Sequence, residues 1–172
     1  MTFDLKLCII IYVYTFIKFS KGKSRIKCGR AEKMTRRKAR ELAFSLLFEQ
    51  KFDLERNIEE IYDTAIEVRE AEDDSYVREI VNGVLANREE IFSLIEKHSH
   101  GWNINRISNT SLSIMQVAVF EMLYTDLPLK IAINEAIELS KIYDDEKARP
   151  FVNGILNSIA RESSGKQIDE QK

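Results

Sequence analysis

The residues best suited to binding another molecule form a basic strip near position 36. The segment MTRRKARE places four cationic side chains within five residues, namely Arg36, Arg37, Lys38 and Arg40. On a helix, Arg36 and Arg40 lie one turn apart with Arg37 beside them. Cations at a helix N-terminus oppose the helix dipole, so dipole stabilisation does not explain them. Planar guanidinium groups bind phosphate and stack on unpaired bases, so the strip suits single-stranded RNA. It would equally suit a solvated helix paired with an acidic body.

Two aromatic residues follow the strip along the same predicted helix. Phe44 and Phe48 lie off the apolar stripe that contains Leu42 and Leu46, closer to the basic side. Aromatic rings beside cations form a surface on which unpaired bases can stack. We therefore expect a basic strip with neighbouring aromatic side chains.

The sequence offers few groups that could catalyse a reaction. Its two histidines, His98 and His100, are two residues apart in a predicted loop, and no cysteine follows position 28. A zinc site needs more ligands than this. Phosphate-binding loops of the G-x-x-x-x-G-K-S/T type, dinucleotide-binding glycine motifs and the G-x-S-x-G elbow do not occur. We expect no enzyme, no metal site and no cofactor.

The charges are unevenly distributed along the chain. Residues 1–33 contain eight Lys and Arg against two Asp and Glu, whereas residues 34–172 contain 18 against 26. Such asymmetry indicates an anionic partner at one place, most often nucleic acid or a membrane surface. Because the body contains no cysteine, a reducing cytosol is the natural compartment and we expect a cytoplasmic protein.

Residues 1–33 form a basic and apolar extension. The apolar run at residues 7–17 is shorter than the roughly 20 residues that cross a bilayer. Asp4 and the missing small-residue cleavage site argue against a signal peptide. A weak membrane-surface anchor stays open, but we expect Met34 to be the true start, with an unstructured or misassigned extension before it.

The body has the apolar periodicity of helices throughout. Three- and four-residue spacing, with Thr35 and Asp74 or Ser75 as N-caps, predicts an all-α domain over residues 34–163 and a polar tail over 164–172. The residues expected on the buried faces include Ala39, Leu46, Ile61, Val81 and Ile133. The predicted helices span about residues 36–51, 55–69, 75–98, 109–125, 129–143 and 150–163.

A faint internal repeat indicates two similar halves. The segment VNGVL at 81–85 recurs as VNGIL at 152–156, and LFE at 47–49 matches VFE at 119–121 at nearly the same offset. We expect two similar three-helix bundles. Glycine within a helix costs about 1 kcal/mol relative to alanine, so Gly83 and Gly154 suggest close contacts between helices.

Several of these segments, in this order and spacing, resemble the bacterial NusB family. They are MTRRKARE, WNINRIS, LPLKIAINEAIELSK and FVNGIL, and together they cover about residues 34–161. The resemblance implies an all-helical fold of two three-helix bundles. It also implies a transcription antitermination factor that binds single-stranded box A RNA of ribosomal RNA leader transcripts. The partners implied are a small-subunit ribosomal protein and the RNA polymerase elongation complex, with no membrane.

The resemblance also assigns site residues. The arginine-rich start of the family corresponds to Arg36, Arg37, Lys38 and Arg40, and its RNA-contacting aromatic corresponds to Phe151. Phe48 falls near the surface that binds the protein partner. Two alternatives stay open: an RNA-binding domain related to ribosomal RNA cytosine methyltransferases, and a helical protein-interaction module without an RNA role. The sequence leaves open whether the protein is a monomer or a homodimer.

Overall fold

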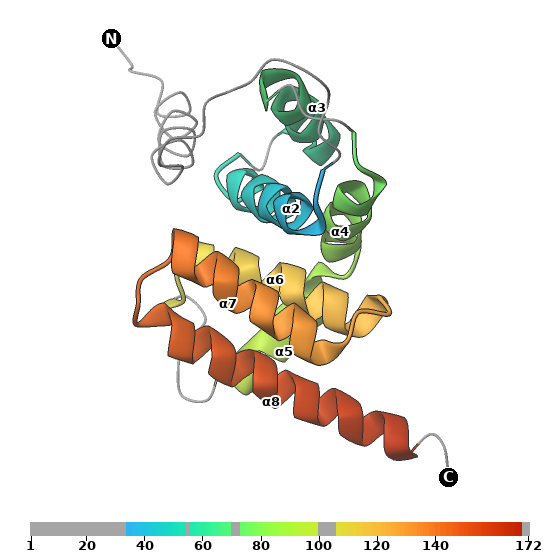
Figure 1. Cartoon of the computed structure of the whole chain (residues 1–172), viewed down its shortest axis with the longest axis vertical. Coiled ribbons are helices and arrows are strands. Elements are labelled where there is room, and N and C mark those ends of the chain that lie inside the picture. Colours follow the sequence, from blue (N-terminus) through green and yellow to red (C-terminus); the bar gives the residue numbers. More distant parts are fainter. Residues whose placement is uncertain (1–33, 54–55, 70–72, 100–105, 170–172) are drawn as a thin grey trace.

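The computed structural model describes residues 34–53, 56–69, 73–99 and 106–169, and every regular element within them is a helix. The expectations for residues 1–33, and for residues 100–105 of the predicted loop, lie outside this part of the chain. The helices are α2 (Arg36–Gln50), α3 (Ile58–Arg69), α4 (Ser75–Ala86), α5 (Arg88–His98), α6 (Asn109–Tyr124), α7 (Leu129–Tyr143) and α8 (Ala148–Asp169) (Figure 1). None of these helices is long and apolar enough to cross a bilayer.

Short polar side chains begin three of the helices. The Thr35 hydroxyl accepts a hydrogen bond from the backbone N–H of Lys38 at 3.3 Å, as expected for an N-cap. The Asp74 carboxylate accepts from the N–H of Tyr76 at 2.9 Å, which confirms the predicted cap of α4. Ser108 caps α6 in the same way through the N–H of Ser111.

The helices form two groups that meet at α6. Helices α2, α3 and α4 pack together, and α6 packs against α7 and α8 in the second group (Figure 1). Helix α6 also contacts α2 and α4, and all its side chains from Ser111 to Met122 are buried. Two three-helix groups agree with the predicted bundles, with α5 as an additional helix against α6 and α8.

The single long helix predicted over residues 75–98 is instead two helices. Helix α4 ends at Ala86, and the Asn87 side-chain amide donates to the carbonyl of Gly83 at 2.8 Å. An asparagine side chain that bonds the preceding turn competes with the continuing backbone ladder. The break allows α4 to pack on α2 and α6 while α5 turns toward α8.

The ends of two other helices also differ from the prediction. Helix α3 begins at Ile58, three residues later than expected, with the Asn57 side chain accepting from the N–H of Glu59. Helix α8 begins at Ala148, before Pro150, which lies in its first turn where proline is tolerated. Its backbone continues to Asp169, so most of the predicted polar tail is helical.

The two repeated glycines have different surroundings. A Cβ added to Gly83 would lie 2.1 Å from Cε2 of Phe120, so α4 and α6 approach as closely as expected. A Cβ added to Gly154 would meet nothing within 4 Å, and this glycine is exposed. The expectation of a close helix contact at Gly154 is therefore wrong.

Candidate nucleic-acid interface

Three of the four predicted cations are exposed at the start of α2. Arg36, Arg37 and Lys38 lie in the first turn, directly after the Thr35 cap. The Arg36 guanidinium stacks 4.2 Å above the ring of Tyr76 in α4, which holds it against the surface. Arg37 is 57% exposed, and its Nη2 lies 3.6 Å from Oε2 of Glu138 in α7. These cations are held by the folded body yet stay accessible to an anion.

Arg40 does not belong to this exposed surface. Its residue exposure is 6%, and its Nε donates to Oε1 of Glu121 in α6 at 2.7 Å. Its Nη1 donates to Oε2 of Glu135 in α7 at 3.3 Å. The sequence analysis placed Arg40 in the basic strip with Arg36 and Arg37, but α6 and α7 cover its side of α2. Arg40 instead joins three helices.

The electrostatics of Arg40 follow from this burial. Desolvation, the largest single effect, lowers its pKa, but the charge and hydrogen bond of Glu121, with smaller contributions from Tyr76 and Glu135, together raise it, so Arg40 stays charged. The Tyr76 hydroxyl also donates to Glu121. Burial and this hydrogen bond raise the Tyr76 pKa well above its usual value, so Tyr76 stays neutral. The network fixes Tyr76, whose ring supports Arg36.

The aromatic residues of α2 do not lie beside the cations. Phe44 is 4% exposed, and its ring centroid lies 5.1 Å from that of Tyr143 in α7. The expectation that Phe44 faces the basic side is therefore wrong. Phe48 is half-buried, and its centroid lies 5.0 Å from that of Phe52, which is 43% exposed. This row, which we call the aromatic edge (Phe48 and Phe52), lies at the other end of α2. The four-residue spacing of Phe44, Phe48 and Phe52 in the sequence was the available signal for Phe52.

Phe151 is the fourth residue of α8 and packs half-buried against the core. It is neither a fully exposed stacking platform nor a fully buried core residue. Two residues earlier, Nη1 of Arg149 lies 3.9 Å from Oε1 of Glu146. The carboxylate of Glu138 in α7 pairs with Arg37 of α2 and is within electrostatic range of Arg149. Its pKa is lowered by a hydrogen bond from Lys141 first, and then by the charges of Arg37 and Arg149. The start of α2 and the first turn of α8 therefore share one charged region.

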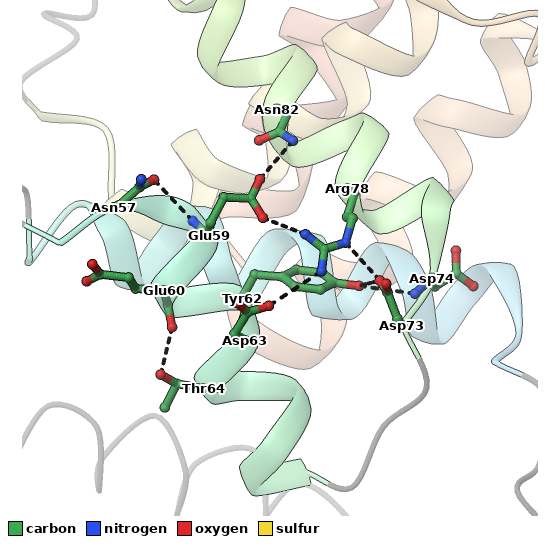
Figure 2. A network of polar contacts seen from close by, with 10 residues as sticks. All are labelled: Asn57, Glu59, Glu60, Tyr62, Asp63, Thr64, Asp73, Asp74, Arg78 and Asn82. Carbon is green, nitrogen blue, oxygen red and sulfur yellow. Dashed lines mark hydrogen bonds and ion pairs between the residues drawn. The ribbon is translucent and has the colours of Figure 1, made fainter.

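A second polar network, which the sequence analysis missed, ties α3 to α4 (Figure 2). Arg78 contacts three carboxylates, with Nε 2.9 Å from Oδ1 of Asp73 and Nη2 3.4 Å from Oδ1 of Asp63. Its Nη1 bonds Glu59, and its Cζ lies 4.1 Å from the ring centroid of Tyr62. Because its anionic groups outnumber the single cation, this network would repel a phosphate and positions α3 instead.

The described histidine has a structural role. His98 at the end of α5 lies within hydrogen-bond distance of Ser158 (Nδ1, 2.7 Å) and Glu162 (Nε2, 2.8 Å), both in α8. Lys97 donates to the same Glu162 carboxylate. This cluster joins α5 to α8, and no group of His, Cys, Asp and Glu among the described residues could hold a metal ion.

Comparison with known proteins gives one consistent family. A family model described as the NusB family matches residues 37–161. The chain is 43% identical to the transcription antitermination protein NusB of Listeria monocytogenes serotype 4a over 131 residues, covering 75% of this chain and 98% of the relative. It is 39% identical to the NusB protein of Acetivibrio thermocellus, covering 74% and 90%.

Solved structures agree with this. NusB from T. maritima superposes with a TM-score of 0.70 at 31% identity, covering 76% of this chain and 94% of the other. A crystal structure of the antitermination factors NusB and NusE in complex with double-stranded RNA matches with a TM-score of 0.65 at 29% identity, covering 75% and 99%.

Proposed function

The chain belongs to the NusB family, and on that premise we propose that it is a transcription antitermination factor that binds RNA together with a protein partner. The RNA is the single-stranded box A element of ribosomal RNA leader transcripts, and the partner is a small-subunit ribosomal protein. The complex joins elongating RNA polymerase in the cytoplasm and supports ribosomal RNA synthesis. Binding and assembly, without a catalytic step, account for this role.

The observation that carries the RNA proposal is the cluster of exposed cations at the start of α2. Arg36 and Arg37 extend from a helix that Arg40 anchors through buried contacts with Glu121 and Glu135. The pair between Arg37 and Glu138 is exposed and loose at 3.6 Å. Exposed ion pairs stabilise proteins by about 0–1 kcal/mol, so a phosphate can displace the carboxylate. Helix α2 thus holds these cations in place without pairing them tightly to a carboxylate of the protein.

The aromatic edge supports the second half of the proposal. Phe52 is one of the few large apolar side chains that the described structure leaves exposed, and Phe48 is half-buried next to it. Aromatic residues that are anchored on one side and open on the other are typical of protein interfaces. Because the edge lies at the opposite end of α2 from the cations, a partner bound there leaves the RNA surface open and can extend it.

Salt-dependent filter binding tests the RNA proposal. The box A RNA is titrated as a single strand and as a duplex, because the solved relative was bound to double-stranded RNA. We expect the single strand to bind more tightly, and the partner to increase the affinity. Replacing Arg36 and Arg37 by alanine should weaken binding and flatten the salt dependence by roughly 0.7 units of slope per lost contact.

The matched control removes two positive charges elsewhere. Arg88 and Arg161 are exposed residues of α5 and of the later part of α8, away from the start of α2. Their double alanine variant has the same net charge as the Arg36 and Arg37 variant. Equal losses of affinity in both variants would show an effect of net charge alone. A folded Arg36 and Arg37 variant with the affinity and slope of the unmodified protein would remove α2 from the RNA surface.

A further inference from the structure

Glu138 of α7 contacts one cation from α2 and one from its own helix, and a third cation begins α8 nearby. Arg37 of α2 lies 3.6 Å from Oε2 of Glu138, and Lys141, one turn later on α7, donates a hydrogen bond to Oε1. Arg149 at the start of α8 is close enough for its charge to help lower the Glu138 pKa, after Lys141 and Arg37. Glu138 therefore contacts Arg37 and Lys141 directly and lies within electrostatic range of Arg149.

Lys141 is hydrogen-bonded to Glu138 itself, whereas Arg37 and Arg149 make only loose ion pairs with carboxylates. The side chains of Arg37 and Lys141 are 57% and 47% exposed, and Glu138 itself is 40% exposed. Arg149 makes only a loose ion pair, at 3.9 Å, with Glu146, whose side chain is 90% exposed. The buried Nε of Arg149 has no hydrogen-bond partner among the described residues.

The arrangement resembles an anion site in which a protein carboxylate occupies the anion's place. We propose that Glu138 gathers Arg37, Lys141 and Arg149 in the free protein and is displaced from them when an RNA phosphate binds. The RNA surface then continues from α2 across α7 to α8, and Glu138 limits its affinity. This inference rests on the proposed function and adds a regulating residue and two binding residues to the same site.

The direction of the effect follows from two opposing contributions. Glu138 orders the cations, but exposed pairs of this kind stabilise little, so losing that order weakens RNA binding slightly. Glu138 also repels a phosphate that enters the same group of cations. The two negative charges would lie a few ångström apart, which is less than the Debye length of about 8 Å at physiological ionic strength. Salt therefore screens their repulsion only in part. Repulsion is the larger contribution.

The test is the affinity of Glu138→Gln for single-stranded box A RNA, measured by filter binding across a salt series. We expect binding about three- to tenfold tighter than that of the unmodified protein, with a steeper salt dependence. The matched control is Glu89→Gln in the first turn of α5, which removes the same charge from an exposed site. It should change affinity less than twofold. Lys141→Ala and Arg149→Gln should each weaken binding several-fold and flatten the salt slope.

The possible outcomes separate the two proposals. In one outcome Glu138→Gln binds the RNA no more tightly than Glu89→Gln, while the Arg36 and Arg37 variant loses affinity. This result overturns only the role of Glu138. If Lys141→Ala and Arg149→Gln retain full affinity, the surface ends at α2 and the inference is again wrong. If the unmodified protein binds no RNA, both proposals fail. Thermal melts establish that each variant is folded, and the Lys141 and Arg149 variants keep the test decisive if Glu138→Gln is unstable.

Discussion

Arg40 and Glu121 form a buried ion pair across 81 residues of sequence, with Nε of the arginine 2.7 Å from Oε1 of the glutamate. Their side chains are 7% and 1% exposed, so the pair joins α2 to α6 in the interior. Tyr76 donates to the same carboxylate, and Glu135 accepts from the same guanidinium. An arginine within a basic strip is thus part of the core.

Replacing Arg40 by alanine should destabilise the protein strongly. Removing one partner of a buried pair leaves an uncompensated charge, here Glu121, and costs about 3–5 kcal/mol of unfolding free energy. Arg37→Ala removes an exposed arginine of the same helix and should change stability by less than about 0.5 kcal/mol. Urea unfolding of both variants measures the difference. Similar midpoints would mean that Arg40 does not support the core.

Alanine at the two repeated glycines should have opposite effects. Gly154→Ala places a methyl group in open space on a helix and should stabilise by about 1 kcal/mol. Gly83→Ala drives a Cβ into the Phe120 ring, which is buried and stacked on Tyr124, and overpacking costs about 1–3 kcal/mol. Thermal melts of the two variants check this. A stabilised Gly83→Ala would show that α4 and α6 can separate freely.

Lys51 should make stability depend on pH. Burial first, and the nearby charge of Arg88 second, lower the pKa of Lys51 from 10.5 to about 8 in the folded protein. Between about pH 8 and 10.5 the unfolded chain therefore binds more protons at this residue than the folded one, so its contribution favours folding increasingly as the pH rises. Lys51→Met should be more stable than the unmodified protein at pH 7, and this advantage should shrink toward pH 10. Melting curves of both proteins from pH 7 to pH 10 test this prediction. If the extra stability of Lys51→Met did not change with pH, it would come from packing and not from the Lys51 charge.

Phe151→Ala should show whether Phe151 stacks on an RNA base or only packs against the protein core. Because Phe151 is half-buried, its loss should destabilise less than the roughly 3–5 kcal/mol of a fully buried phenylalanine, on the order of 2 kcal/mol. If Phe151 stacks on a base, RNA affinity falls by about 1–3 kcal/mol while the salt slope stays nearly unchanged. Phe151→Leu, which retains apolar contact without an aromatic ring, is the control. Unchanged RNA affinity in the folded alanine variant would leave Phe151 with a packing role only.

Residues 1–33 should be dispensable. The helical periodicity and the family match both begin after them, at about residues 34–37. A chain of residues 34–172 should therefore melt at the same temperature as the full chain and bind RNA with the same affinity. A melting temperature lower by several degrees would instead make the extension part of the folded domain.

The sequence alone determined the all-helical class, the positions of most helices and the Thr35 N-cap of α2, the helix that begins with the basic strip. These follow from local rules: apolar spacing at three and four residues, and hydroxyl or carboxylate side chains that satisfy the first free N–H groups. Apolar periodicity does not indicate where an asparagine side chain interrupts the backbone hydrogen bonds of a helix, so the sequence analysis missed the break at Asn87. It also cannot distinguish an exposed glycine from one against a neighbouring ring, as Gly154 and Gly83 show.

Only the tertiary structure decided which residues of the strip are available to a ligand. Arg36, Arg37 and Arg40 are equivalent in the sequence, but α6 and α7 bury the last through Glu121 and Glu135, which lie 81 and 95 residues away. The same packing buries Phe44 against Tyr143 and brings Glu138 to Arg37. Which cation meets which carboxylate depends on contacts between distant helices, and a local pattern of charges contains no information about them.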